Sequence, residues 1–92
     1  MKPAGERSVE IEFCVPCDLR SEAVAAVREL LAEWVFQIKE LRLVPGTGGR
    51  FEVTVDGVLV FSKAALGRTP EPGELAELFG RLPTTAASDS QA

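Results

Sequence analysis

Three short stretches of the chain alternate apolar and polar residues, a pattern typical of strands that bury one face. They cover residues 9–13, 38–44 and 51–55. A fourth strand is predicted at residues 58–63, because the Asp56-Gly57 dipeptide before it favours a tight two-residue turn. The third and fourth strands would then form an antiparallel hairpin.

Between the first two strands, the spacing of apolar residues changes to that of a helix. A helix is predicted over residues 18–33, with an apolar face formed by Leu19, Ala23, Ala26, Val27, Leu30, Leu31 and, at its end, Trp34. A connector at residues 64–72 leads to a second predicted helix at residues 73–82, which Pro83 ends.

The resulting order, β-α-β-β-β-α, predicts an α/β fold with a four-stranded mixed sheet. A strand–helix–strand start implies a parallel strand pair with a right-handed crossover. Because strands covered on one side alternate in polarity, both helices are expected on one face of the sheet. The uncovered face would carry Glu10, Glu12, Glu40, Arg42, Glu52 and Thr54. We expect one domain at residues 8–82, between a flexible N-terminus at 1–7 and a disordered tail at 83–92.

The fourth strand departs from this one-sided pattern. A two-residue turn would place Val60 opposite Val53, so Leu59 and Phe61 would lie on the uncovered face. An exposed apolar pair there would suit a weak homodimer or another partner. Cover by a loop, the connector or the tail is the alternative.

Composition argues against several classes of function. The formal net charge is −4 and the basic residues are scattered, so nucleic acids and anionic membranes are not expected as partners. No stretch approaches the roughly 20 apolar residues of a membrane span, and the first residues lack an apolar leader, so we expect a cytoplasmic protein. The chain has no histidine, which removes histidine-dependent catalysis and any Cys/His zinc site within one chain. No cofactor or metal is expected.

The two cysteines form the motif Cys14-Val15-Pro16-Cys17, between the first strand and the first helix. In a cytoplasmic protein this spacing is more typical of a redox or metal site than of a structural disulfide. The positive end of a helix stabilises a thiolate, and two intervening residues allow a disulfide to close. The pattern predicts dithiol–disulfide exchange, with Cys14 as the more exposed thiolate. A zinc ion held by the thiolates of two chains and a pair of buried structural thiols are the alternatives.

Neighbouring residues could support this chemistry. Pro16 would fix the backbone of the motif. Asp18 would raise the pKa of a thiol or carry a proton, or would simply favour the helix N-terminus. Arg20 would stabilise a thiolate or bind a glutathione carboxylate, or would extend into solvent. The loop from Gly46 to Gly49, which includes Gly48, would form a flexible rim that brings backbone N–H groups near the thiols.

Several motifs occur in a fixed order along the chain. They are VEIEFCVPC at 9–17, LVPG at 43–46 followed by Gly48-Gly49, FEVTVDG at 51–57, FSK at 61–63, Gly67-Arg68 and Pro70-Glu71-Pro72. In this combination the chain resembles the selenoprotein W-like proteins, the group that includes selenoproteins T and H, in a bacterial form with cysteine at both positions of the motif.

This resemblance implies a reduced thioredoxin-like fold and a role in thiol redox processes, with glutathione or a thioredoxin-type protein as electron donor. In the selenocysteine-containing relatives, selenium occupies the position of Cys17, so both Cys17 and Cys14 are candidates for the attacking thiol. Larger thioredoxin-like proteins place a cis-proline before the third strand. Gly48, Gly49 and Arg50 precede that strand here, so the standard thioredoxin mode of substrate binding is not expected.

We therefore predict a thiol–disulfide redox protein in which Cys14 and Cys17 react with a thiol or disulfide, such as glutathione or a protein thiol. The alternative is a redox-sensitive protein-binding module without turnover.

Overall fold

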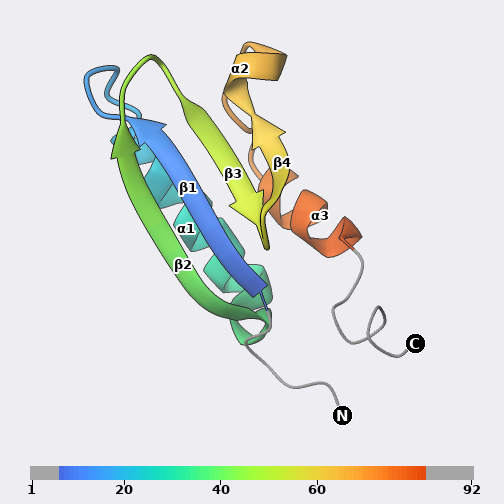
Figure 1. Cartoon of the computed structure of the whole chain (residues 1–92). Helices are drawn as coiled ribbons and strands as arrows, with labels where there is room; N and C mark the ends of the chain where they lie inside the picture. The colour runs from blue at the N-terminus through green and yellow to red at the C-terminus, as the bar shows by residue number, and fades with distance from the viewer. Residues whose placement is uncertain (1–6, 83–92) are drawn as a thin grey trace.

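The computed structural model describes residues 7–82. The predicted flexible N-terminus, except for Arg7, and the predicted disordered tail lie outside these residues. The elements, shown in Figure 1, are β1 (Arg7–Cys14), α1 (Arg20–Trp34), η1 (Val35–Gln37), β2 (Ile38–Gly46), β3 (Phe51–Val55), β4 (Val58–Ser62), α2 (Lys63–Leu66) and α3 (Glu74–Arg81).

The four strands form one mixed sheet in the order β2-β1-β3-β4. β1 runs parallel to β2 and antiparallel to β3, and β3 and β4 form the predicted hairpin. α1 crosses behind the sheet between β1 and β2, and α3 packs against α1 and β4 (Figure 1). The predicted α/β architecture, with both long helices on one face, is confirmed.

The core lies between the sheet and the two long helices. Alternate residues of the strands point into it, and α1 and α3 close it from one side. Its buried members are Val9, Ile11, Phe51, Val53, Val55 and Phe61 from the sheet, Ala23, Ala26 and Leu30 from α1, and Leu75 and Phe79 from α3. Fully burying one large apolar side chain stabilises a fold by about 1.5–3 kcal/mol. Leu31, predicted on the buried face of the first helix, is instead exposed.

The opposite face of the sheet is polar, as the alternation predicts. Glu10 lies beside Arg42 on β2 and forms an ion pair with it. Glu12 lies opposite Glu52 on β3, and Arg50 forms an ion pair with Glu12 at 3.4 Å. These exposed pairs contribute little to stability, but they offset the repulsion between facing carboxylates.

The predicted exposure of Phe61 is wrong because β4 contains a β-bulge. Phe61 pairs with Val53 and Leu59 with Thr54, which leaves Val60 as an extra residue. The bulge moves Phe61 to the core face, where it is 2% exposed and meets Phe51 edge to face. Burial of a large aromatic ring favours this register over a regular one. Leu59 remains 56% exposed on the open face.

Trp34 joins the two long helices at the end of α1. Its indole Nε1 donates a hydrogen bond to the carbonyl oxygen of Ala76 at 2.9 Å. Its ring packs against Phe79 with centroids 5.4 Å apart. α3 approaches so closely that a Cβ at Gly80 would lie 2.7 Å from Cζ2 of Trp34. Glycine at position 80 therefore permits the close contact of α1 and α3.

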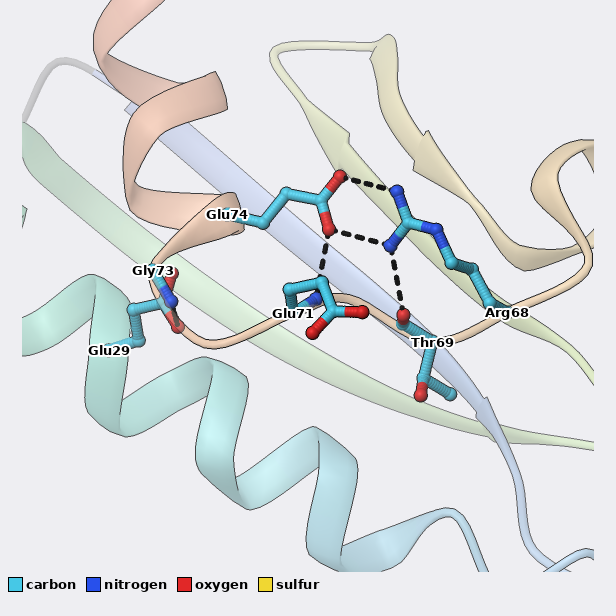
Figure 2. Close-up of polar contacts among 6 residues, drawn as sticks. All are labelled: Glu29, Arg68, Thr69, Glu71, Gly73 and Glu74. Carbon is cyan, nitrogen blue, oxygen red and sulfur yellow. Dashed lines mark hydrogen bonds and ion pairs between the residues drawn. The ribbon is translucent and has the colours of Figure 1, made fainter.

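The connector between β4 and α3 is ordered, although the sequence predicts no element there. The hydroxyl of Ser62 caps the short helix α2 by accepting a hydrogen bond from the N–H of Ala65. Beyond α2, Arg68 donates two hydrogen bonds to the carboxylate of Glu74 (Figure 2). The Arg68 guanidinium also lies over the ring of Phe61. These contacts hold the connector against the core.

Glu29 of α1 fastens the start of α3 to the rest of the fold. Its carboxylate accepts hydrogen bonds from the N–H of Gly73 at 3.0 Å and of Ala76 at 2.7 Å. These N–H groups belong to the first turn of α3, where no intrahelical partner is available. Gly73 adopts φ of 84°, a left-handed conformation that favours glycine.

Within residues 7–82, every helix is too short or too polar to span a membrane.

Candidate functional site

The cysteine motif lies where β1 ends, in a turn that precedes α1. The N–H of Asp18 donates to the carbonyl oxygen of Val15 at 2.9 Å, and the N–H of Leu19 donates to that of Cys14 at 3.1 Å. The helix begins at Arg20, so the predicted start at residue 18 is wrong and the motif precedes the helix. Asp18 has a left-handed φ of 60°, and a residue in this conformation cannot belong to a right-handed helix. The helix therefore begins after Asp18.

Cys14 and Cys17 form a disulfide, with Cα atoms 5.3 Å apart. The backbone N–H of Cys17 donates a hydrogen bond to Sγ of Cys14 at 3.3 Å. Cys14 is fully buried and Cys17 is exposed. The expectation that Cys14 is the more exposed thiol is therefore wrong. Cys14 is the last residue of a strand flanked by β2 and β3, whereas Cys17 lies in the turn beyond the sheet.

The loop between β2 and β3 holds the motif in place. The N–H of Cys14 donates to the carbonyl oxygen of Arg50 at 2.8 Å, and the N–H of Val15 donates to that of Gly46 at 3.0 Å. The loop therefore borders the motif as predicted, but through Gly46 and Arg50. Gly48 and Gly49 supply the left-handed turn, with φ of 77° and 74°. Among the described residues, neither glycine donates a hydrogen bond to a cysteine sulfur.

At this rim, sequence reasoning missed Arg50 and Lys63, and it did not predict the contact between Gly46 and Glu12. A Cβ at Gly46 would lie 2.9 Å from Oε2 of Glu12, so its glycine allows the carboxylate to sit against the loop. Arg50 supplies both the carbonyl for Cys14 and the cation for Glu12. The ammonium of Lys63 lies beside Gly49, 3.7 Å from a Cβ placed there. The residue types gave no signal for the contacts of Gly46 and Arg50 with the motif, because main-chain carbonyls make them.

The other predicted site residues lie on the solvent side of the motif. Pro16 is exposed in the turn. Asp18 and Arg20 form an ion pair at 3.0 Å, and both side chains are mostly exposed. The N-cap of α1 is Leu19, without a side-chain hydrogen bond, so Asp18 does not cap the helix. The hydrogen-bond partner of Arg20 is Asp18, and not a sulfur.

Within one chain, the described side chains do not form a metal site. Among residues 7–82, no three Asp, Glu, Cys or His side chains gather in a way that could hold a metal ion. A tetrahedral thiolate site would need two further ligands beside Cys14 and Cys17. The arrangement suits the chemistry of two neighbouring thiols.

Comparison with known proteins gives a family and two related structures. The family model described as the Rdx family matches residues 8–81. The crystal structure of a selenoprotein W-related protein from Vibrio cholerae superposes with a TM-score of 0.75 at 30% identity, covering 80% of this chain and 92% of that one. A crystal structure from Bordetella parapertussis superposes with a TM-score of 0.76 at 28% identity, covering 86% and 96%. A search of curated proteins finds no match.

Proposed function

Because this chain belongs to the Rdx family, whose model matches residues 8–81, we propose that it exchanges thiols and disulfides through Cys14 and Cys17. The observation that carries the proposal is the closed pair at the end of β1, with one sulfur buried and the other at the surface. A substrate can reach Cys17 from solvent, whereas the buried Cys14 can be reached by Cys17.

The proposed reaction has two steps. In the reduced protein, the thiolate of Cys17 attacks one sulfur of a substrate disulfide, forms a mixed disulfide and expels the other substrate sulfur as a thiolate. The thiolate of Cys14 then attacks Sγ of Cys17, closes the Cys14–Cys17 bond and releases the second substrate thiolate. The substrate gains two electrons and its thiolates take up two protons, while the two cysteines are oxidised.

The geometry of the motif supports this division of roles. Cys14 is held by main-chain hydrogen bonds to Arg50 and Leu19, so its sulfur is fixed in place next to Cys17. The N–H of Cys17 points at Sγ of Cys14, and a hydrogen bond of this kind favours negative charge on the acceptor. The resolving thiolate is thus positioned and stabilised by the residue it attacks.

The oxidised pair needs a thiol reductant to complete a cycle. Glutathione is the proposed donor class, since two glutathione molecules can reduce one disulfide and leave as glutathione disulfide. The resemblance to selenoprotein W-like proteins supports a thiol donor, and a thioredoxin-type protein is the other candidate. The physiological disulfide substrate would be a small disulfide or a protein.

The test is steady-state reduction of bis(2-hydroxyethyl) disulfide by glutathione, coupled to glutathione reductase and read as consumption of NADPH. The wild-type protein should turn over and Cys17→Ser should lose activity to the uncatalysed rate. Circular dichroism must show that the variant is folded. Full activity in Cys17→Ser, or none in the wild-type protein, would overturn the proposal.

A further inference from the structure

One flank of α1 presents an apolar stripe to solvent. Val24, Leu31 and Val35 are each between 42% and 49% exposed. Val24 and Leu31 are seven residues apart in α1, so they lie on one side of the helix. Val35 is the first residue of η1, directly after the end of α1. The opposite side faces α3 and its connector, where Ala26 and Glu29 border a small hollow with Pro70 and Leu75. The stripe is therefore on the side of α1 away from α3.

The edge strand β2 adds one exposed apolar residue on the face of the sheet that carries α1. Leu43 is the register partner of the buried Ile11, so it lies on the face of the sheet that the helices cover. It is nevertheless 44% exposed, because α1 does not cover the outer part of β2. We call the surface formed by Val24, Leu31, Val35 and Leu43, with the adjoining Arg20 and Arg28, the α1–β2 flank.

The charge on this flank is opposite to that of the whole chain. Arg20, Val24 and Arg28 line a shallow depression on the outer side of α1. The acidic residues of this helix, Glu22, Glu29 and Glu33, share the other side by their spacing. The formal net charge of the chain is −4, yet the flank of α1 carries only cations.

Neither arginine on the flank is committed to a strong partner. Among residues 7–82, the side chain of Arg28 forms no ion pair or hydrogen bond. The partner of Arg20 is Asp18, and both side chains are largely exposed. Exposed pairs of this kind are worth little, so a carboxylate from a partner could replace Asp18. The flank is thus complementary to an apolar surface bordered by acidic residues.

The flank begins at the redox motif. Arg20 follows Cys17 by three residues, and the turn that carries the motif projects beside the end of β2 (Figure 1). Val15, inside the motif, is also exposed. The helix α1 has 15 residues, so it spans about 22 Å, or roughly four turns. A partner segment of similar length on the flank would bring a nearby disulfide to Cys17.

We propose that the α1–β2 flank is the docking surface for protein substrates that present an amphipathic segment, apolar in the middle and bordered by Asp or Glu, next to their disulfide. The inference rests on the proposed thiol–disulfide exchange, because the docked proteins are the substrates of that reaction. Binding to the flank needs no thiol chemistry and is tested without it.

The test uses oxidised wild-type protein and two fluorescein-labelled helical peptides of about 20 residues, a length that matches the helix with a margin. Both have the same leucine stripe and no cysteine, and they differ only in Glu or Lys at the bordering positions. Fluorescence anisotropy at low salt should show the Glu peptide binding at least about tenfold more tightly, and added salt should reduce the difference.

Variants locate the binding. Arg28→Glu and Leu31→Ser should each weaken binding of the Glu peptide by about fivefold or more, the size typical of one interface contact. Glu33→Lys changes a charge on the opposite side of α1, and Leu66→Ser changes an apolar residue of similar exposure on α2. Both controls should keep the wild-type affinity. Circular dichroism confirms that each variant is folded.

Several results would overturn the docking surface. They are equal affinity for the two peptides, binding too weak to saturate, and equal losses in the control variants. A dimer in sedimentation experiments that Leu31→Ser dissociates would also overturn it, because a second copy would then cover the flank. Failure of the protein to reduce bis(2-hydroxyethyl) disulfide, with peptide binding intact, would instead reject the proposed exchange reaction and leave the surface in place.

Discussion

The N–H of Cys17 donates a hydrogen bond to Sγ of Cys14, so the exposed cysteine supports the sulfur of the buried one. This relationship follows from the turn between β1 and α1, in which the chain folds back over the end of the central strand. It makes the two thiols unequal in access and in environment. The order of the two cysteines in the sequence does not indicate which one meets a substrate.

Because of the bulge in β4, truncation of Phe61 and truncation of Leu59 should change the free energy of unfolding by very different amounts. Phe61→Ala should lower the free energy of unfolding by about 3–5 kcal/mol, because it leaves a cavity beside Phe51. Leu59→Ala should change it by less than about 0.5 kcal/mol, since its side chain is on the surface. Urea unfolding followed by Trp34 fluorescence measures both. Similar costs for the two variants would argue for the regular register.

The contact between Gly80 and Trp34 predicts that alanine at position 80 lowers the free energy of unfolding, although alanine normally favours helices. Alanine improves helix propensity by about 1 kcal/mol over glycine, but overpacking costs about 1–3 kcal/mol. The indole is fixed by its bond to Ala76 and by Phe79, so the steric cost should prevail. We expect Gly80→Ala to destabilise the protein by about 1 kcal/mol or more in urea unfolding.

The same substitution in a Trp34→Leu background provides the control. With the ring removed, Gly80→Ala should be neutral or stabilising by up to about 1 kcal/mol, because only the propensity gain remains. An equal penalty in both backgrounds would show that the indole is not the cause. The unfolding of this pair must be followed by circular dichroism, because the only tryptophan is absent.

The Arg68–Glu74 pair predicts a loss of stability in acid. The hydrogen bonds from the Arg68 guanidinium, and then that from the N–H of Glu71, lower the pKa of Glu74 from 4.5 to about 2 (Figure 2). A carboxyl whose pKa is lower in the folded state stabilises the fold above its unfolded pKa. That contribution declines as the pH falls from about 4.5 towards about 2.

Glu74→Gln should therefore be less stable than the wild-type protein at pH 6, and the difference should shrink at pH values near 2. Urea unfolding at both pH values measures it. Glu40→Gln, on the open face, controls for the loss of one negative charge. If the difference in unfolding free energy between Glu74→Gln and wild type does not change with pH, Arg68 does not lower the pKa of Glu74.

The strands and long helices could be predicted because their signals are local. The alternation in β1 and β3 and the helical spacing in α1 reflect burial on one side of each element. The bulge at Val60 was not visible, because it results from competition between hairpin register and the burial of Phe61, a tertiary effect. α2 is only four residues long and is stabilised by the Ser62 cap, so it lacks a periodic pattern.

The candidate site was predictable in its chemistry but not in its exposure. The spacing of Cys14 and Cys17 indicated that the two sulfurs lie close together. The disulfide between them confirms this placement. The burial of Cys14 depends on β2 and β3, which flank it from later in the sequence. The main-chain contacts of Gly46 and Arg50 likewise need the assembled sheet, because a carbonyl leaves no mark on residue type.

Stopped-flow reaction of the reduced proteins with 5,5′-dithiobis(2-nitrobenzoate) distinguishes attack by Cys17, with Cys14 as the resolving thiol, from attack by Cys14. The wild-type protein should release two thionitrobenzoate ions per chain. Cys14→Ser should release one, at the rate of the first wild-type step, and retain a stable adduct on Cys17. Cys17→Ser should react at least about tenfold more slowly, because its remaining thiol is buried. Fast reaction of Cys17→Ser together with slow reaction of Cys14→Ser would contradict the account and assign the attack to Cys14.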